Sequence, residues 1–487
     1  MKALKVHQLD NVGVALENLA GGEEVLGLQL TQAIPKGHKF ALSDIAKDQA
    51  ILKYGHPIGR TTETISAGAH VHSHNLVTAL TSGDAYHYQP ADKPALSHTH
   101  TDTFEGYLRS NGRAGTRNEI WVLNTVGCVN ATAARVATSS RASGAVEGIH
   151  AFSHPFGCSQ LGDDLDHTRK ILAALASHPN AGGVVIIGLG CENNQLDRLL
   201  ETVDPTVKQR IRSFSAQRVQ DEELSGLDAV QELMEIMSED KRETLPTSLL
   251  TLGMKCGGSD AFSGLTANPL VGQMTDRVTA QGGRAILTEV PEMFGAEQLL
   301  MNRAETPEVY QQTVELIEEF KRYFTANHQP VSENPSPGNI EGGITTLEEK
   351  SLGAIQKGGV ATVNDVIDYG EQVTKAGLSL LQGPGNDAVS STALTAAGAN
   401  LILFTTGRGT PLGFPVPTMK IASNSTLATD KSRWIDFNAG ALLDGESLTA
   451  VADALWQQIL RTASGEPSRN ETNGYREIAL WKTGVTL

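Results

Sequence analysis

Four cysteines occupy equivalent places in the chain, each at the end of an apolar run of strand length. They are Cys128, Cys158, Cys191 and Cys256, and the first three directly follow a glycine. Their separations are 30, 33 and 65 residues, whereas one strand–helix unit takes about 30 residues. The spacing therefore predicts one thiol per unit at the carboxyl end of a strand, with the cysteine-free strand 210–217 filling the longest interval.

The predicted position of these thiols suggests a metal. The carboxyl ends of parallel strands form one edge of a sheet, where ligands bind, so we expect all four thiols on the functional edge. Thiolates favour soft or borderline metals, including iron. The chain has no CxxC pair, which disfavours a structural zinc site. The alternative is that the cysteines are small apolar residues of the core.

Histidines provide a second group of candidate ligands. His70, His72 and His74 alternate along the chain, and alternate residues of a strand point to the same face. Three imidazoles on one face suit a first-row metal, and the alternative is a polar strand edge that faces solvent. His154 lies four residues before Cys158, close to the same predicted strand end, and is a candidate for acid–base catalysis.

Polar loops offer groups that could bind a substrate. Segment 255–269 combines glycines with hydroxyl, amide and carboxylate side chains, among them Ser259, Asp260 and Asn268. It matches neither a Walker A loop nor a G-x-G-x-x-G fingerprint, so no nucleotide is implied. Directed hydrogen bonds to a sugar acid suit it better. Arg408 lies between two glycines and could hold a carboxylate with its planar fork; the alternative is an ordinary loop arginine.

These candidates need a scaffold of strands and helices. From about residue 105 onward, apolar runs of strand length alternate with helix-like runs, which predicts an α/β fold of mainly parallel sheets flanked by helices. Residues 1–82 have short apolar runs between closely spaced turn signals, which predicts a small all-β domain. We expect a polar linker at 83–104, an α/β domain at 105–250 and a C-terminal α/β catalytic domain at 251–487.

The composition disfavours several classes of protein. The chain has 487 residues, a formal net charge of -16 and 40% hydrophobic residues, which is enough for two or three globular domains. An acidic balance disfavours nucleic-acid binding, because phosphate contacts need a basic surface. There is no apolar run of membrane-spanning length and no apolar region of signal-peptide type at the start. We therefore expect a cytoplasmic protein without membrane partners.

Several longer motifs point to a known family. They include HVHSHN (70–75), GCSQLGDD (157–164), GLGCENNQ (188–195), CGGSDAFSGLTANP (256–269) and TTGRGTP (405–411). Across essentially its whole length the chain resembles the altronate dehydratase and galactarate dehydratase family, and its first domain resembles the SAF β-clip domain of that family.

The resemblance implies a hydro-lyase of hexuronate catabolism. The implied reaction converts D-altronate to 2-dehydro-3-deoxy-D-gluconate plus water, with Fe2+ or alternatively Mn2+ as the cofactor. The alternative within the family is galactarate dehydratase, or a related lyase that acts on another sugar acid. We expect a small sugar acid as the partner and a homo-oligomeric enzyme.

The chemistry of such a reaction assigns roles to the candidate residues. Dehydration of a 2,3-dihydroxy acid removes the C2 proton, expels the C3 hydroxyl and forms an enediolate that a divalent metal can stabilise. We expect the metal ligands among the four cysteines, His70 and His72. We expect Arg408 on the carboxylate and His154 or Asp260 in proton transfer. The hydroxyls of the substrate are assigned to Ser259, Asn268 and Asn334.

Two interpretations from other classes remain beside this one. A nucleotide-dependent oxidoreductase also uses a parallel sheet, but the chain has no glycine fingerprint after its first strand. The other is a sugar-acid-binding protein without catalysis, which an assay for keto acid would distinguish.

Overall fold

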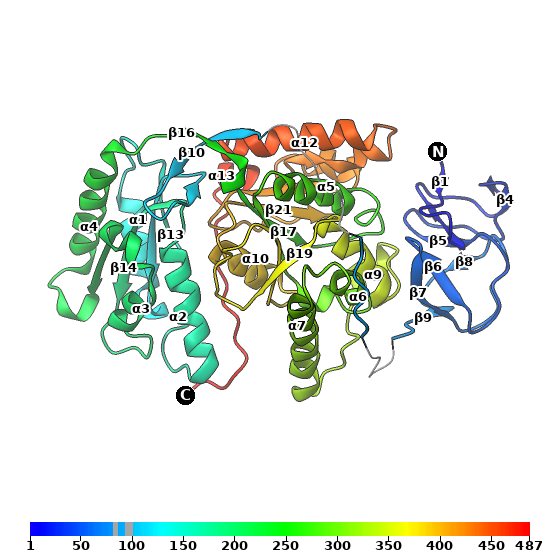
Figure 1. The fold of residues 1–487 in the computed structure, drawn as a ribbon, viewed down its shortest axis with the longest axis horizontal. Coiled ribbons are helices and arrows are strands. Elements are labelled where there is room, and N and C mark those ends of the chain that lie inside the picture. Colours follow the sequence, from blue (N-terminus) through cyan, green and yellow to red (C-terminus); the bar gives the residue numbers. More distant parts are fainter. Residues whose placement is uncertain (81–85, 93–100) are drawn as a thin grey trace.

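The computed structural model describes residues 1–80, 86–92 and 101–487, and the N-terminal residues form a small all-β domain (Figure 1). Its strands are β1 (Ala3–Leu4), β2 (Val12–Ala15), β3 (Glu24–Val25), β4 (Leu28–Gln29), β5 (Lys39–Ala41), β6 (Ala50–Lys53), β7 (His56–Thr61), β8 (His70–Val71) and β9 (Leu76–Val77). They form antiparallel sheets in the orders β1-β2-β5-β8 and β6-β7-β9, with a separate β3-β4 pair. Turns separate the short strands. At one of them Gly37 has a φ of +84°, a conformation that favours glycine.

A four-stranded parallel sheet organises the second domain. Its strands are β12 (Glu119–Asn124), β13 (Gly148–Ala151), β14 (Ala181–Gly188) and β15 (Ile211–Ser215), and its helices are α1 (Asn130–Ser139), α2 (Gly162–Ala176), α3 (Leu196–Thr202) and α4 (Glu222–Ile236). The strand order is β13-β12-β14-β15. Alternate residues of β12 point to opposite faces: Ile120 packs with the α1 and α4 side chains, and Trp121 packs with those of α2 and α3.

A short antiparallel sheet joins this domain to the rest of the chain. It contains β10 (Thr103–Leu108), β11 (Ala114–Gly115) and β16 (Glu243–Pro246), in the order β11-β10-β16. Of the predicted linker 83–104, residues 83–85 and 93–100 lie outside the described residues. In the described part, the Tyr86 hydroxyl donates to Glu297 and the Tyr88 hydroxyl to the Ala304 carbonyl.

The C-terminal domain is built on a seven-stranded parallel sheet. Its strands are β17 (Thr251–Cys256), β18 (Arg284–Leu287), β19 (Val363–Ile367), β20 (Gly377–Leu381), β21 (Leu401–Thr406), β22 (Thr418–Ala422) and β23 (Phe437–Asn438). The order is β19-β20-β18-β17-β21-β22-β23, which places β17 at the centre. Every residue of β17 is buried, as expected of a strand whose sheet is covered on both faces.

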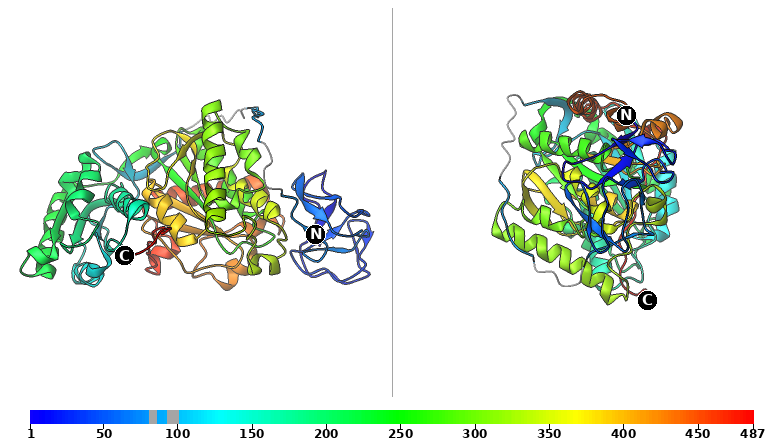
Figure 2. Two further views of the ribbon diagram at one scale, coloured as in Figure 1. Left: turned by 90° about the horizontal axis from the view of Figure 1, so that it is seen from below. Right: turned by 90° about the vertical axis from the view of Figure 1, so that its right-hand side faces the viewer.

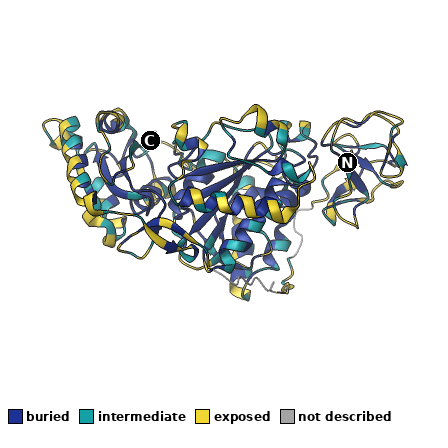
Figure 3. Cartoon of the chain, turned by 90° about the horizontal axis from the view of Figure 1, so that it is seen from above, coloured by how far each residue is buried: buried dark blue, intermediate teal, exposed yellow. Residues whose placement is uncertain are grey.

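Helices cover both faces of this sheet (Figure 3). They are α5 (Ala267–Ala280), α6 (Glu297–Met301), α7 (Pro307–Ala326), α8 (Pro337–Glu341), α9 (Leu347–Ala354), α10 (Asp387–Ala396), α11 (Ser425–Asp430), α12 (Leu448–Ala463) and α13 (Arg469–Thr472). On one face, Ile402 and Phe404 of β21 share a core with Trp121 and with α2 of the second domain. The two α/β domains are thus packed together. The N-terminal domain and the second domain lie at opposite ends of the molecule, with the C-terminal domain between them (Figures 1 and 2).

The prediction of an α/β fold with mainly parallel sheets and a small all-β domain is confirmed. Within the described ranges, no helix is long and apolar enough to cross a membrane.

A buried ion-pair triad attaches the N-terminal domain to helix α9. The Lys39 ammonium lies 2.8 Å from one carboxylate oxygen of Glu349, and the Lys53 ammonium lies 2.8 Å from the other. Thr345 also donates to this carboxylate from its backbone and its hydroxyl. Burial by itself would raise the pKa of Glu349, but the two ammonium groups outweigh it and hold the pKa well below its usual range. The contact therefore depends on complete pairing of desolvated charges.

Replacing Glu349 by Gln is expected to destabilise the protein strongly, because two buried ammonium groups would lose their counter-charge. The expected loss is about 3–5 kcal/mol in the free energy of unfolding, measured by urea unfolding. The matched control is Glu201→Gln, which removes one carboxylate from the exposed Arg198–Glu201 pair and should cost about 1 kcal/mol or less. Equal stability of the two variants would contradict the assignment.

Candidate active site

The carboxyl edge of the seven-stranded sheet gathers the densest set of charged side chains. Strand β17 ends at Cys256, β18 leads into Glu289 and β21 leads into Arg408. Because all seven strands are parallel, these segments emerge at the same edge, which is where α/β proteins bind ligands.

A buried network of ammonium and carboxylate groups lies at the end of β17. Lys255 pairs with Glu289 and lies 2.9 Å from Asp387. The Lys357 ammonium lies 3.1 Å from Glu289 and 2.8 Å from the Cys256 sulfur. Lys255 and Glu289 are fully buried, so each charge depends on the others for the solvation that water would otherwise provide.

The backbone and the thiol of this network are both perturbed. Glu289 has a φ of +67°, in the left-handed region that costs a residue with a side chain about 1–2 kcal/mol, and strained residues of this kind cluster at functional sites. Burial raises the pKa of the Cys256 thiol, and the carboxylates of Glu289 and Glu292 raise it further. Burial and both carboxylates therefore favour the neutral form of the thiol.

Helix α9 connects the network to the N-terminal domain. Lys350 follows Glu349 in sequence and lies 2.9 Å from Glu292, which also accepts a 3.0 Å hydrogen bond from the Cys256 thiol. Burial would raise the pKa of Glu292, but the surrounding lysines, led by Lys350, lower it to about 2. Lys350 also donates to Asn334, a predicted hydroxyl-binding residue, at 3.0 Å.

Cys256, Glu289 and Glu292 could hold a metal ion by their spacing alone. Their ligand atoms all lie within 4.8 Å of one another. However, Lys357 already contacts Cys256 and Glu289, and Lys350 contacts Glu292. The carboxylates already have lysine counter-charges and the surroundings favour the neutral thiol, so these residues fit a divalent cation poorly.

Asp260 lies in the loop after β17 with its carboxylate held by neighbouring donors. Its Oδ1 accepts hydrogen bonds of 2.9 Å from the Ser263 hydroxyl and 2.8 Å from the Ser423 hydroxyl. Its Oδ2 accepts from Asn424 at 3.1 Å. Together with Ser259, Asp260 lines a small cavity that Tyr54, Asn268, Lys350 and Glu349 also border. Three residues predicted from segment 255–269 are therefore brought together.

Ser259 and Asn268 hold the loop through buried contacts. The Ser259 carbonyl accepts a 2.8 Å hydrogen bond from Asn339. The Asn268 amide donates to the Gly353 carbonyl, and its oxygen accepts from the Thr405 hydroxyl.

Arg408 is a half-exposed cation at the carboxyl edge of the seven-stranded sheet. Its guanidinium lies 2.7 Å from the carboxylate of Glu341, at the end of α8, and that carboxylate is 75% exposed. An exposed pair of this kind is weak, so a substrate carboxylate could displace Glu341 at low cost.

Imidazoles of the N-terminal domain lie against the same helix. His38 and His70 approach within 3.0 Å through their ring nitrogens, and the His38 and His72 rings stack at 4.7 Å. The other nitrogen of His38 contacts the Glu341 carbonyl, and His72 contacts the Ile340 carbonyl. The imidazoles therefore contact the backbone of Glu341, the partner of Arg408, and of the residue before it.

The cluster disfavours protonation of its central ring. Burial, followed by the positive charge that His38 and His72 would carry, lowers the pKa of His70 to about 3. The rings of His70 and His74 are 5.5 Å apart, but the predicted strand covers only His70 and Val71, and His72 and His74 lie in the turn that follows. Within the described ranges, however, no three of their nitrogens lie within 4.8 Å of one another.

The structure divides the four predicted thiols between two sheets. Cys128, Cys158 and Cys191 follow strands of the second domain and are exposed, whereas Cys256 ends β17 and is buried. The expectation of one shared edge is therefore wrong for Cys256. Along the chain, β16 comes between the two parallel sheets and pairs with β10 in a sheet of its own. The regular alternation of strands and helices therefore continues into a second parallel sheet.

His154 lies beside the thiols of the second domain and is buried. Its Nε2 donates to the Asn124 carbonyl at 2.8 Å, and its Nδ1 accepts from the Phe156 backbone at 3.2 Å. Both ring nitrogens are thus engaged by backbone groups, and burial lowers the pKa of the ring.

Sequence reasoning missed His38 and the lysines of the network. His38 lies in no alternating pattern with His70, and only the folding of β5 against β8 brings the two together. Lys255 could have been identified from the sequence, because it lies at the end of an otherwise apolar strand. A charge in such a strand must be paired when the strand is buried. The network's other lysines, Lys350 and Lys357, lie in helical segments, where a lysine is unremarkable.

Comparison with known proteins covers all three domains. Residues 1–79 match the altronate/galactarate dehydratase SAF domain, residues 106–238 the D-galactarate dehydratase/altronate hydrolase second domain, and residues 247–486 the D-galactarate/altronate dehydratase C-terminal domain.

Three curated relatives align along nearly the full chain. The altronate dehydratase of Escherichia coli is 48% identical over 496 residues, with 100% of both chains covered. That of Bacillus subtilis is 46% identical over 493 residues, with 99% of both covered. The L-threo-forming galactarate dehydratase of Escherichia coli is 35% identical over 490 residues, which cover 95% of this chain and 93% of the relative.

The low pKa of His70 predicts a specific acid sensitivity. In the folded protein the pKa is about 3, below the ordinary value of about 6.5, so the unfolded chain binds more protons at intermediate pH. Stability must therefore fall as the pH drops below about 6.5. Replacing His70 by Gln should make the fall in unfolding midpoint between pH 6.5 and 5 shallower.

The control for this experiment is His87→Gln, which changes an exposed histidine outside the cluster. Its pH profile should follow that of the wild-type protein. Parallel profiles for the wild-type and His70 variants would show that the imidazole cluster has no such role.

Proposed function

This chain belongs to the altronate and galactarate dehydratase family, and we propose that it is a hydro-lyase that converts D-altronate to 2-dehydro-3-deoxy-D-gluconate and water. The observation that carries the proposal is the full-length similarity to two altronate dehydratases, with all three domains of the family present. The galactarate dehydratase is the more distant relative, which favours altronate as the substrate.

We place the substrate at the junction around helix α8. Arg408, Asp260 and the imidazoles of His38 and His72 all lie against this short helix or the residues that follow it. The junction has a cation for the carboxylate, a carboxylate for proton transfer and neutral imidazoles for hydroxyl groups. Such a combination is what a polyhydroxylated acid requires.

In this proposal Arg408 binds the substrate carboxylate in place of Glu341. Its two parallel N–H donors fix the plane of the carboxylate, and the positive charge stabilises the enediolate that forms when C2 loses its proton. Lys350 adds a second cation near the cavity, and Asn334 beside it is assigned to a hydroxyl of the substrate.

Asp260 is proposed to carry the proton. Its Oδ1 is fixed by three donors from Ser263 and Ser423, whereas its Oδ2 accepts from Asn424 alone in the described part of the chain. The Oδ2 lone pairs are therefore available to take the C2 proton or to return one to the departing C3 hydroxyl. His154 lies in the second domain with both nitrogens engaged, so proton transfer is assigned to Asp260.

Dependence on Fe2+, or on Mn2+, is part of the proposal. When bound, a divalent metal supplies a Lewis acid for the carboxylate and the C2 hydroxyl. The Cys256 group fits such an ion poorly, so none of the roles given to Arg408 and Asp260 depends on it.

The substrate assignment predicts a preference that steady-state kinetics can measure. With Fe2+ or Mn2+ supplied under reducing conditions, kcat/KM for D-altronate should exceed that for galactarate by about tenfold or more, because the site discriminates by directed contacts to hydroxyl groups. Formation of the 2-keto-3-deoxy acid is the readout. A higher kcat/KM for galactarate would overturn the assignment within the family.

Replacing Arg408 by Lys keeps the charge but loses the planar fork. If Arg408 binds the carboxylate, kcat/KM should fall about 10- to 100-fold, the scale of a hydrogen bond to a charged group. Arg198→Lys is the matched control, since Arg198 forms an exposed pair on the second domain, and it should keep wild-type kinetics. Unchanged kinetics in a folded Arg408 variant would remove this residue from the site.

A further inference from the structure

Three exposed thiols follow three neighbouring strands of the second domain. The order β13-β12-β14 makes β12 the middle strand, flanked on both sides by parallel partners. Cys128 comes after β12, Cys158 after β13 and Cys191 after β14, and all three are exposed. Cysteine is among the residues most often fully buried, so three exposed thiols at one edge of a sheet call for an explanation.

Hydrogen bonds lock the three cysteine-bearing loops to one another. The Gly127 backbone N–H donates to the Phe156 carbonyl at 2.9 Å, which joins the loops of Cys128 and Cys158. The Asn194 backbone N–H donates to the Gly157 carbonyl at 2.9 Å, and the Ser159 backbone N–H donates to the Asn193 side chain at 2.8 Å. Residues within three positions of each thiol are therefore bonded across the loops, which fixes the three loops relative to one another.

The glycine before each cysteine permits this close approach. A Cβ on Gly157 would lie 2.0 Å from the Thr125 carbonyl oxygen, and one on Gly127 would lie 2.9 Å from the His154 carbonyl oxygen. Gly157 and Gly190 also have φ values of +102° and +131°, where a side chain is strained. The repeated Gly-Cys pairs therefore follow from the packing of the three loops.

His154 acts as a buried support for this edge. Its ring connects the end of β12, through the Asn124 carbonyl, with the Phe156 backbone in the loop of Cys158. The Asn130 side chain adds a 2.9 Å bond to the His154 carbonyl. On the other side, the backbone of Leu487 donates to the Ser159 carbonyl. The thiols thus lie on rigid loops.

Two helices begin close to these thiols. Helix α1 begins two residues after Cys128, and α2 begins four residues after Cys158, so the positive ends of two helix dipoles lie beside the sulfurs. The contacts of Cys158 and Cys191 are with the Ser159 hydroxyl at 3.9 Å and the Gln217 amide at 3.5 Å. Cys256, by contrast, is buried against the Lys357 ammonium.

The three sulfurs do not all lie within 4.8 Å of one another, as ligands of one metal ion would. Two thiolates on one tetrahedral ion lie about 3.8 Å apart, given a metal–sulfur distance of about 2.3 Å. Among the described residues, no group of three ligand atoms within 4.8 Å of one another includes these sulfurs. Three thiolates that each bind a different iron suit this wider spacing, and iron–sulfur clusters are held by cysteine thiolates in this way.

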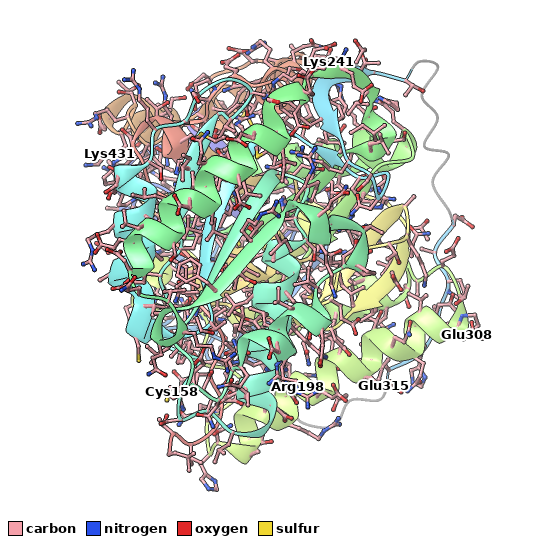
Figure 4. All side chains as sticks on the ribbon, turned by 90° about the vertical axis from the view of Figure 1, so that its left-hand side faces the viewer. Cys158, Arg198, Lys241, Glu308, Glu315 and Lys431 are labelled. Atoms are coloured by element: carbon pink, nitrogen blue, oxygen red, sulfur yellow. The ribbon has the colours of Figure 1, made fainter. Side chains whose placement is uncertain are left out.

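We propose that Cys128, Cys158 and Cys191 ligate a 4Fe–4S cluster through three of its irons. The fourth iron then has no protein thiolate and is open to an oxygen ligand. A carboxylate or hydroxyl oxygen of a hydroxy acid suits this position, which is separate from the junction around helix α8 where the proposed function places the reacting substrate. The site belongs to the second domain, which lies at the end of the molecule opposite the N-terminal domain (Figure 1). Figure 4 shows Cys158 at the margin of the second domain.

The test is the metal and sulfide content of protein purified without oxygen. The wild-type protein should contain about four irons and four acid-labile sulfides per chain, with visible charge-transfer absorption. Cys128→Ser, Cys158→Ser and Cys191→Ser should each lose most of the iron, the sulfide and the absorption. Cys256→Ser is the matched control and should retain all three, because Cys256 lies in the other sheet. Circular dichroism identifies any Ser variant that fails to fold. The Ala variant at the same cysteine is then measured in its place.

Three results would overturn the cluster: no iron, iron without acid-labile sulfide, or full sulfide content in all three variants. The first would leave the thiols without a metal, and the second would indicate a single ion. These contents are measured without substrate, so they are independent of the proposed function. A protein with the cluster that turns over no altronate would contradict the function alone.

The open iron is tested separately by adding D-altronate to the loaded protein. A change in the visible spectrum of the cluster, absent with an equal concentration of sodium chloride, would support an oxygen ligand at the fourth iron. An unchanged spectrum at saturating altronate would overturn that part of the proposal.

Discussion

The pairing of Glu349 with Lys39 and Lys53 is the contact on which the arrangement of this protein depends. Neither lysine can remain charged in the interior without that carboxylate, and the carboxylate needs both of them. The pairing fixes helix α9 against the N-terminal domain, and the neighbouring Lys350 pairs with Glu292 of the C-terminal domain. Two adjacent residues of one helix thus connect the imidazoles of the first domain to the charged edge of the third.

The same physical rule governs the end of β17. Lys255 and Lys357 face Glu289 in an interior that excludes water, so the network is stable only as a balanced set. Such a set is preorganised, because its dipoles and charges need no rearrangement when a ligand gains charge nearby. The left-handed backbone of Glu289 is retained because these pairings outweigh its strain.

The cysteines show how one residue type acquires different chemistry from its surroundings. Burial and the neighbouring carboxylates raise the pKa of the Cys256 thiol, and the Lys357 ammonium contacts its sulfur. Cys128, Cys158 and Cys191 are exposed on loops that hydrogen bonds and tightly packed glycines hold together. The first belongs to a buried charge network, and the other three are exposed after neighbouring strands of a second sheet.

The sequence by itself determined the α/β class, the all-β first domain and the position of each cysteine after a strand, because these features depend on local periodicity and turn residues. It also indicated the loop of Asp260 and the exposed Arg408. Only the tertiary structure decided that β17 belongs to a separate sheet from β12, which removes Cys256 from the other thiols. Only the tertiary structure brought His38 to His70 and paired Lys39 with Glu349, 310 residues away. Strand order and contacts between distant segments depend on which surfaces are buried together, and a local pattern of residues carries no record of that choice.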